Sequence, residues 1–165
     1  MEQPNQPAIC HLLKVQAITL IPEVVKIHPL NPQAVRHIKS LSDAVGMTSL
    51  GIHLVRVEPG KETTEFHFHH HEEEFIYILS GKGIAEIGEI QYEVEAGDFM
   101  GFTARSVPHC MRNPFNMDLV YLMGGERSHI DICDYPRLRK RLISINDEHH
   151  LVELQGTFSV KSRGK

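Results

Sequence analysis

The stretch that decides the fold is HFHHHEEEFIYILSG, residues 67–81. It places four imidazoles and three carboxylates directly before an apolar run, Phe75 to Leu79, and it ends at a glycine. Short apolar runs that end at glycine are typical of β-strands followed by tight turns. The stretch therefore predicts metal-binding side chains held in a frame of strands and turns.

The spacing of the histidines fits an extended strand. Successive side chains of a strand point to opposite faces, so His67, His69 and His71 would share one face. Two or three imidazoles would then line the same wall. We expect a hairpin at residues 71–73 to return the chain and to bring Glu74 beside the histidines.

A further imidazole, His109, lies downstream and is followed four positions later by Asn113. A β-meander could bring it back beside the first cluster. Neutral imidazoles and one carboxylate suit Mn, Fe(II), Co, Ni, Cu or Zn, and they suit Ca²⁺ or Cu(I) poorly. The alternative is a solvent-exposed histidine-rich loop that binds metals only adventitiously.

Composition limits the kinds of partner. The 165 residues, 41% of them hydrophobic, fit one compact domain, and the formal net charge is −4. This charge argues against nucleic acid or an anionic membrane surface as the main partner. Residues 58–98 are rich in acidic side chains and residues 136–165 in basic ones. We interpret them as two solvated surfaces of opposite sign rather than as a docking patch.

The cysteines and the N-terminal residues indicate a compartment. Cys10, Cys110 and Cys133 are widely spaced and form neither a disulfide framework nor a cysteine-rich zinc site. Residues 1–7 lack the basic start and apolar run of a signal peptide, and no apolar run reaches the length of a membrane span. We therefore expect a soluble, cytoplasmic protein with no membrane partner.

The N-terminal part of the chain predicts strands and one helix. Residues 14–27 are rich in Val and Ile and predict one or two strands interrupted at Pro22. Asn31 and Pro32 resemble a helix N-cap and a first-turn proline, with Gly46 as the helix stop. The apolar residues between them fall at helical spacing: Ala34, Val35, Ile38, Leu41 and Val45. We expect this segment to form the only substantial helix.

From Leu50 onward the pattern is that of an antiparallel β protein. Short apolar segments are separated by turns at Pro59-Gly60 and at several later glycines. Many short strands at regular spacing predict a sandwich or barrel of the jelly-roll kind. Strands are expected at residues 52–57, 75–79, 117–123, 129–133, 142–145, 151–154 and 158–160. Residues 162–165 are expected to be disordered.

Two segments resemble the conserved motifs of the cupin superfamily. The first has this order: Pro59-Gly60, six residues, His67-x-His69, four residues, Glu74, six residues, Gly81. The second has this order: Gly97-Asp98-Phe99, Val107-Pro108-His109, three residues, Asn113. Together the two segments cover residues 59–113.

The resemblance implies an all-β fold, the cupin double-stranded β-helix or jelly-roll barrel, with a short helix before the first motif and extra N- and C-terminal strands. It implies one divalent transition metal, Mn, Fe, Ni or Zn, inside the barrel. By position in the motifs, the metal ligands would be His67, His69, Glu74 and His109, and Asn113 would be structural.

The same resemblance implies one cupin domain over residues 1–165. Its barrel core would span about 48–125, its N-terminal strands 10–30 and its C-terminal extension 136–165. The wider pattern is similar to small single-domain bacterial cupins that are often described as sugar-phosphate-isomerase-like.

One departure from the second motif concerns residues 103–105. Thr-Ala-Arg stands where Pro-x-Gly is usual, and we expect Arg105 to project toward the pocket mouth. Arg105 and Arg127 could bind a carboxylate or a phosphate, with ordinary surface positions as the alternative. His70 and His71 are expected to be exposed or to support the ligands, and Cys110 to point away from the metal.

Three functions remain open for a protein that would bind a small polar molecule. The first is a metal-dependent isomerase, in which the ion acts as a Lewis acid on vicinal oxygens of a sugar phosphate or hydroxy acid. The second is a metal-dependent dioxygenase, and the third is a non-catalytic cupin that binds a small ligand or the metal alone. Cupins commonly form homodimers through sheet edges and exchanged N-terminal strands, so residues 14–27 could pair with a second copy.

Overall fold

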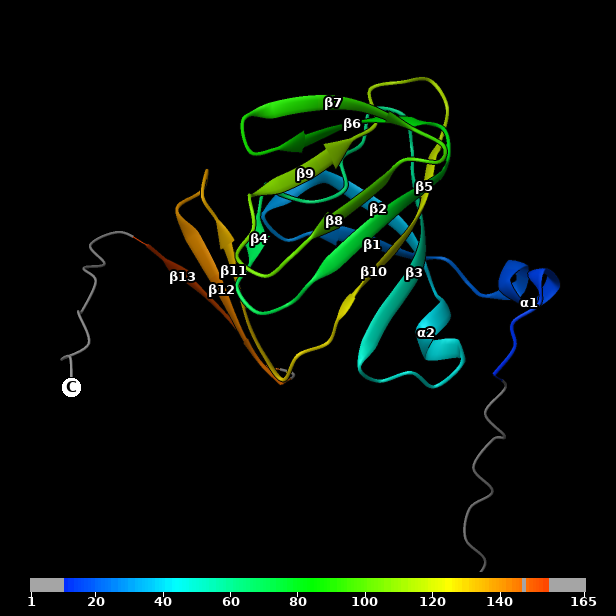
Figure 1. Cartoon of the computed structure of the whole chain (residues 1–165), viewed down its shortest axis with the longest axis horizontal. Helices are drawn as coiled ribbons and strands as arrows, with labels where there is room; N and C mark the ends of the chain where they lie inside the picture. Colours follow the sequence, from blue (N-terminus) through cyan, green and yellow to red (C-terminus); the bar gives the residue numbers. More distant parts are fainter. Residues whose placement is uncertain (1–10, 147, 155–165) are drawn as a thin grey trace, which may run out of the picture.

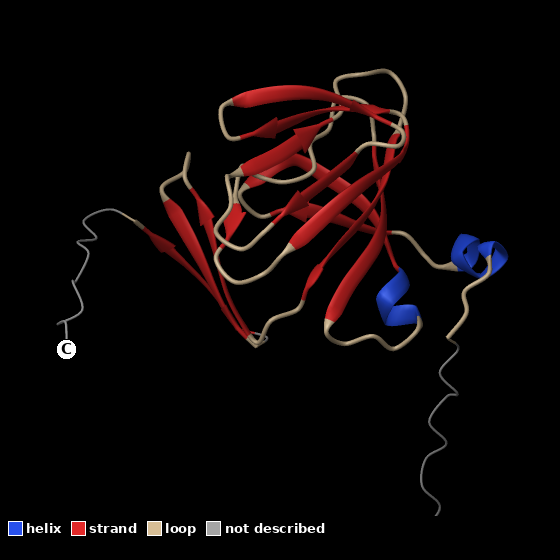
Figure 2. Cartoon of the chain, in the orientation of Figure 1, coloured by secondary structure: helices blue, strands red, loops and turns tan. Residues whose placement is uncertain are grey.

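The computed structural model describes residues 11–146 and 148–154, and these residues form mainly β-strands (Figure 2). The two helices in this part of the chain are short: α1 (Val15–Leu20) and α2 (Leu41–Ala44). The strands, in chain order, are β1 (Val24–His28), β2 (Asn31–Ser40), β3 (Leu50–Val57), β4 (Phe68–His69), β5 (Glu74–Ser80), β6 (Lys82–Ile87), β7 (Ile90–Glu95), β8 (Phe99–Phe102), β9 (His109–Arg112), β10 (Leu119–Glu126), β11 (Ile130–Tyr135), β12 (Lys140–Ile145) and β13 (Glu148–Glu153).

The strands form three sheets (Figure 1). The largest has the order β1-β2-β3-β10-β5-β8, the second has the order β13-β12-β11-β4, and the third has the order β7-β6-β9. The hydrophobic core draws its residues from the first and third sheets, which pack on each other: Ile38, Val55, Val57, Ile78, Ala85, Val94, Met100, Phe102, Met111, Leu119 and Tyr121. The predicted jelly-roll barrel is confirmed.

The predicted helix over residues 31–45 is wrong. Residues 31–40 form β2, which pairs with β1 and β3, and the helix that follows has only four residues. Ala34 and Ile38 are the buried side chains of β2. A spacing of four residues satisfies both the helical period and the period of two of a strand, so the apolar pattern could not separate them.

The N-terminal prediction of strands over residues 10–30 is right only in part. β1 confirms the second half, but residues 15–20 form helix α1, in which no side chain is buried. Val and Ile favour strands through packing on a half-buried face, and this segment has no such face.

The predicted hairpin at residues 71–73 is also wrong, because β4 and β5 belong to different sheets. β4 pairs with β11, and β5 pairs with β10 and β8. The connection between β4 and β5 is instead hydrogen-bonded to the end of β10 and the segment that follows it. The backbone N–H of Ser128 donates to Glu72 at 2.8 Å, and that of Glu73 donates to Glu126 at 3.1 Å.

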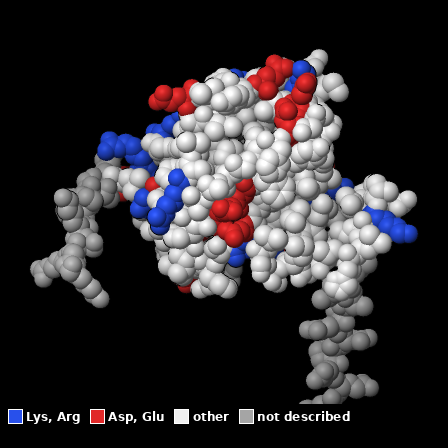
Figure 3. All heavy atoms as spheres, viewed as in Figure 1, with Lys and Arg blue, Asp and Glu red and all other residues white. Residues whose placement is uncertain are grey.

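The C-terminal strands follow the prediction. β12 and β13 include most of segments 142–145 and 151–154, and they extend the sheet that begins with β4 and β11. The segments 158–160 and 162–165 lie outside the described residues. Figure 3 shows basic side chains gathered toward β12 and β13, and acidic ones both around β6 and β7 and near the start of β5. None of the helices in the described part of the chain is long and apolar enough to cross a membrane.

Candidate metal centre

Three of the four predicted ligands meet inside the barrel. The ligand atoms of His67, Glu74 and His109 all lie within 4.8 Å of one another. Nε2 of His109 lies 2.6 Å from Oε1 of Glu74, and Nε2 of His67 lies 3.6 Å from the same oxygen. Both imidazoles are buried, with 8% and 4% of their residue surfaces exposed, so the group is shielded from bulk water.

The backbone brings the two motifs together. His67 and His109 form an antiparallel bridge in which each N–H donates to the other carbonyl, at 3.1 and 2.8 Å. Glu74 is the first residue of β5 and is paired with Gly125 on one side and Phe102 on the other. The Phe102 ring also stacks on the His109 imidazole, with centroids 3.5 Å apart, so packing fixes the ring plane.

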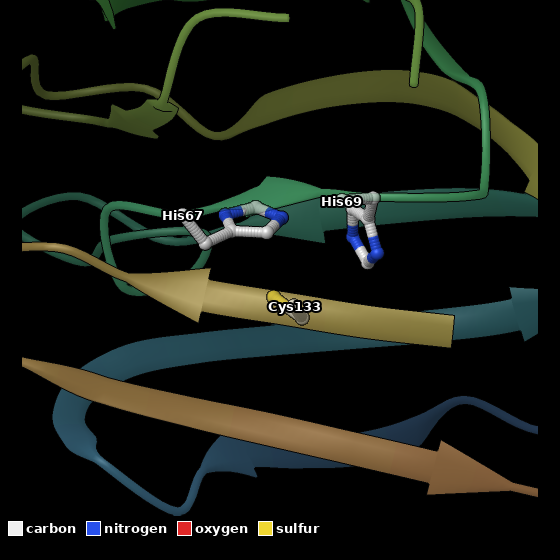
Figure 4. A group of neighbouring side chains, drawn as sticks. All are labelled: His67, His69 and Cys133. Atoms are coloured by element: carbon white, nitrogen blue, oxygen red, sulfur yellow. The ribbon is translucent and has the colours of Figure 1, made fainter. Parts of the chain in front are cut away.

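The fourth predicted ligand, His69, lies beside His67. Their ring centroids are 5.1 Å apart, and His69 pairs with Cys133 across β4 and β11. Figure 4 shows the two imidazoles next to each other, with the Cys133 sulfur on the strand beside them. Ligand atoms of His67, His69 and Cys133 form a second group within 4.8 Å, which overlaps the first at His67.

The three imidazoles are oriented in the same way. Nδ1 of His67 lies 2.9 Å from the Glu65 carbonyl oxygen, and Nδ1 of His109 lies 3.4 Å from that of Val107. Nδ1 of His69 lies 2.6 Å from a carboxylate oxygen of Asp131. Histidines that bind metals commonly donate their second N–H in this way, which makes Nε2 the ligand atom. In His109 that Nε2 lies against Glu74, the carboxylate of the same group. The donor set therefore fits a divalent transition metal.

Electrostatics keep two members of the cluster, His67 and Glu74, in a form suited to a cation. Burial lowers the pKa of His67 to about 3, so its imidazole is neutral at pH 7. Burial also raises the pKa of Glu74, but the hydrogen bond with His109 and the nearby imidazoles outweigh this effect and lower the pKa to about 2. An ionised carboxylate next to neutral imidazole is the protonation state that metal binding requires.

The cluster faces a cavity of about 730 Å³. The motif segments line part of it, and β10, β11 and β12 line another part. The N-terminal hairpin of β1 and β2 also contributes Lys26, His28 and Arg36, which no sequence motif predicts. Sequence reasoning missed Arg36 because residues 31–45 were interpreted as a helix. Alternation along 34, 36 and 38 in a strand was the signal that could have found it.

Other residues at the centre also escaped sequence reasoning. Asp131 lies 2.6 Å from His69 and also accepts the backbone N–H of His71 at 3.2 Å. Glu72 also lines the cavity, with Oε2 4.0 Å from Nδ1 of His69. Burial raises the pKa of the Cys133 thiol to about 12. No local motif marks these positions, since Asp131 and Cys133 reach the site only through β11.

The two arginines that the motifs singled out do not lie free in the cavity. Arg105 is exposed, and its backbone N–H donates to the His69 carbonyl at 2.7 Å, so the expectation that it projects toward the pocket mouth is not supported. Arg127 lines the cavity but is paired with Asp43 at 2.6 Å.

The remaining expectations concern supporting positions. Nε2 of His70 lies 2.9 Å from Asp134, away from the cluster, and His71 is exposed. Asn113 is fully buried and donates to the carbonyls of Val57 and Met117 at 2.9 and 2.8 Å, which is a structural role. Burial raises the pKa of the Cys110 thiol to about 12, and its sulfur contacts Glu86 at 3.9 Å rather than the cluster.

Comparison with known proteins defines the class. The family model described as "Cupin domain" matches residues 53–125, which contain all four predicted ligands. The chain belongs to the cupin superfamily, among its small bacterial members. A search of curated proteins gives no match.

Three solved structures are similar to this chain over most of its length. A candidate sugar phosphate isomerase from Acidithiobacillus ferrooxidans is 44% identical, with a TM-score of 0.89 over 92% of this chain and 97% of that one. A cupin sugar phosphate isomerase from Silicibacter pomeroyi is 22% identical, with a TM-score of 0.77 over 90% of this chain and 96% of that one. A predicted oxalate decarboxylase from Thermotoga maritima is 19% identical, with a TM-score of 0.57 over 67% and 96%. The last two support the fold alone.

Proposed function

We propose that this protein is a single-domain, metal-dependent cupin enzyme that isomerises a sugar phosphate or a similar small polyhydroxylated substrate. One divalent transition metal would be held by His67, His69, Glu74 and His109. The observation that carries the proposal is the common orientation of the three imidazoles: each has Nδ1 engaged by a protein oxygen, which leaves Nε2 as the ligand atom. The ionised carboxylate of Glu74 lies within the same group, 2.6 Å from Nε2 of His109.

A bound divalent ion would act as a Lewis acid on vicinal oxygens of the substrate. The residues of the chain then have distinct tasks. Asp131 fixes the imidazole of His69, and Phe102 fixes that of His109. Glu72 is a carboxylate in the same cavity that is not needed as a ligand, so it is our candidate for moving a proton between substrate carbons.

The substrate class rests on similarity and on the shape of the site. The relative from Acidithiobacillus ferrooxidans is aligned over almost the whole of both chains, and its description as a candidate sugar phosphate isomerase supports the same class here. A cavity of about 730 Å³ has room for a molecule of that size.

Elemental analysis tests the metal site first. Protein purified without a His-tag or added metal should contain about one equivalent of Mn, Fe, Ni or Zn, and His67→Ala and His109→Ala should lose it. Glu73→Gln is the matched control, because Glu73 is exposed next to Glu74 and should leave the metal unchanged. Full metal occupancy in both histidine variants would refute the ligand set. If the metal-loaded protein consumes oxygen and does not isomerise the substrate, the dioxygenase function is favoured instead.

We also propose that the protein forms a homodimer through its N-terminal elements. β1 is an edge strand of the large sheet. The exposed apolar side chains of α1 and β1 are Val15, Leu20, Val24, Val25 and Ile27. An exposed edge with apolar side chains is a template for pairing with a second copy.

A further inference from the structure

Arg36 is an inward-facing cation in the middle of β2. It stands between Ala34 and Ile38, which are 0% and 8% exposed, and side chains two positions apart share a face of a strand. Its side chain lines the same cavity as the metal ligands. A guanidinium in this position is costly to desolvate unless an anion accompanies it.

The Arg36 guanidinium lacks such a partner within the protein. Its Nε is buried without a hydrogen-bond acceptor, and its Nη1 has only the sulfur of Met123 at 3.9 Å. Among the described residues no carboxylate oxygen lies within 4.0 Å of it. The paired arginines in the same part of the chain are Arg56, Arg127, Arg137 and Arg141, and each contacts a carboxylate. Arg36 therefore keeps its hydrogen-bonding capacity for a group that enters the cavity.

Two further donors accompany Arg36 on the same hairpin. Lys26 is its direct partner in the pairing of β1 with β2, and it also lines the cavity. Nδ1 of His28 accepts the backbone N–H of Leu30 at 3.2 Å, so in neutral His28 the proton is on Nε2. Nε2 of His28 is thus a donor, and the hairpin offers a guanidinium, an ammonium and an imidazole N–H.

This group of donors is linked to the metal cluster through β10. Arg36 contacts Met123, and Gly125, two residues further along β10, is paired with Glu74. Residues two positions apart on a strand are about 7 Å apart on the same face. Arg36 and the metal-site cluster line the same cavity of about 730 Å³, which has room for a substrate of a few carbon atoms with one end at the metal and the other at the hairpin.

We infer that Arg36, together with Lys26 and His28, forms an anion subsite that binds the phosphate or carboxylate end of the substrate. This inference rests on the proposed function, since it places the opposite end of the substrate at the metal. Arg36 carries the recognition because its planar fork can bind two oxygens of a phosphate or carboxylate at once.

Isothermal titration of the metal-loaded, full-length protein tests the subsite. The probes are ribose 5-phosphate, gluconate and neutral ribose. Arg36→Met keeps an apolar stem against Met123 and removes the charge, and Arg112→Met is the control because Arg112 is exposed and outside the cavity. We expect Arg36→Met to lower the affinity for one or both anionic probes about tenfold or more. The metal content and the affinity for ribose should be unchanged. The control variant should match the wild type.

The outcomes separate the possibilities. Loss for ribose 5-phosphate alone identifies a phosphate subsite, and loss for gluconate alone identifies a carboxylate subsite. Equal affinity of Arg36→Met and wild type for both anions overturns the inference, as does a metal-loaded wild type that prefers neither anion to ribose. If Arg36→Met does not fold, Arg36→Lys replaces it, because lysine keeps the charge but not the planar guanidinium. The same loss of affinity for an anionic probe is then expected, and an affinity equal to that of the wild type overturns the inference.

Failure of the proposed function gives a different result. If the wild type takes up no metal, the metal proposal fails, and the anion subsite is then tested alone with inorganic phosphate. Weaker phosphate binding in Arg36→Met than in wild type supports the subsite, and equal binding overturns it.

Discussion

Asp131 shows how a single residue orients a proposed metal ligand, His69. Its carboxylate lies 2.6 Å from Nδ1 of His69, and it is buried, so the imidazole is held in one orientation with Nε2 free. Loss of such a supporting carboxylate typically costs 10–100-fold in metal affinity. The ligand itself would remain in place.

We therefore expect Asp131→Asn to lower metal affinity about 10–100-fold while one equivalent still binds at saturating metal. Metal titration with a competing chelator measures this change. The control is Asp134→Asn, a buried carboxylate that contacts His70 and Arg141 instead. An affinity for Asp131→Asn equal to that of the wild type would contradict the supporting role.

The buried His67 makes the metal-free protein sensitive to acid. Its pKa is about 3 in the folded state and near 6.5 when unfolded, so the unfolded state binds more protons between these values. Stability should fall as pH decreases from 6.5. Glu74 adds to this below pH 4.5, because its contribution is present above that value and is lost as pH falls toward its folded pKa of about 2.

His69 acts in the opposite direction. Burial lowers its pKa, but the hydrogen bond with Asp131 outweighs this and raises the pKa above 6.5, so its contribution is present at low pH and lost as pH rises. The clearest test is therefore a difference: urea unfolding of metal-free His67→Gln should lose less stability between pH 6.5 and pH 4.5 than the wild type. An identical loss in the two proteins would show that His67 is not held neutral.

At the scale of elements, the turn between β5 and β6 depends on Gly81. Its φ is 77°, and a Cβ there would lie 2.2 Å from the backbone oxygen of Asp118. Gly60 has nearly the same φ, 75°, but a Cβ there would meet nothing within 4 Å. A comparison of alanine substitutions at the two glycines therefore distinguishes the cost of backbone strain from the cost of steric overlap.

We expect Gly60→Ala to cost about 1–2 kcal/mol, the price of a left-handed conformation for a residue with a side chain. Gly81→Ala should cost clearly more, because the backbone of Asp118 must also move. Urea unfolding of both variants gives the comparison. Equal losses would mean that the turn can shift without cost.

Much of the fold could be predicted because strand periodicity and turn residues are local signals. The motif spacing brought out His67, His69, Glu74 and His109, and three of these gather within 4.8 Å. The hairpin at 71–73 could not be ruled out, because the pairing of β4 with β11 involves residues more than sixty positions apart. Asp131 was missed for the same reason.

The segment 31–45 shows a different limit. Its buried residues, Ala34 and Ile38, are four apart, which a helix and a strand accommodate equally. Asn31 and Pro32 then favoured a helix start, although proline is also tolerated near the start of a strand. The consequence was functional, since a helix gives no reason to place Arg36 in the cavity that the proposed metal ligands line.

At the scale of the whole molecule, the N-terminal elements present an apolar edge. Leu20 and Ile27 are 81% and 61% exposed. Leu20 belongs to helix α1, which projects from the barrel in Figure 1, and Ile27 belongs to the edge strand β1. We expect light scattering after gel filtration to give twice the chain mass of 18.8 kDa. Ile27→Lys should shift the protein toward monomer, because a charge would be desolvated at the contact.

Ile90→Lys is the control for that experiment, since Ile90 is 57% exposed but lies on β7 in another sheet. It should leave the mass unchanged. A monomeric wild type at high concentration would remove the dimer proposal and leave the metal site unaffected.

The reciprocal backbone pair between His67 and His109 has a consequence for metal choice. Peptide hydrogen bonds fix the spacing of these imidazoles, so the donors are preorganised before any ion arrives. The proposed site, with three nitrogens and one oxygen, should rank divalent ions in the general order that rises from manganese to copper. The ion found after purification would then record which metals the host cell supplied, and a change of growth medium should change it without altering the barrel.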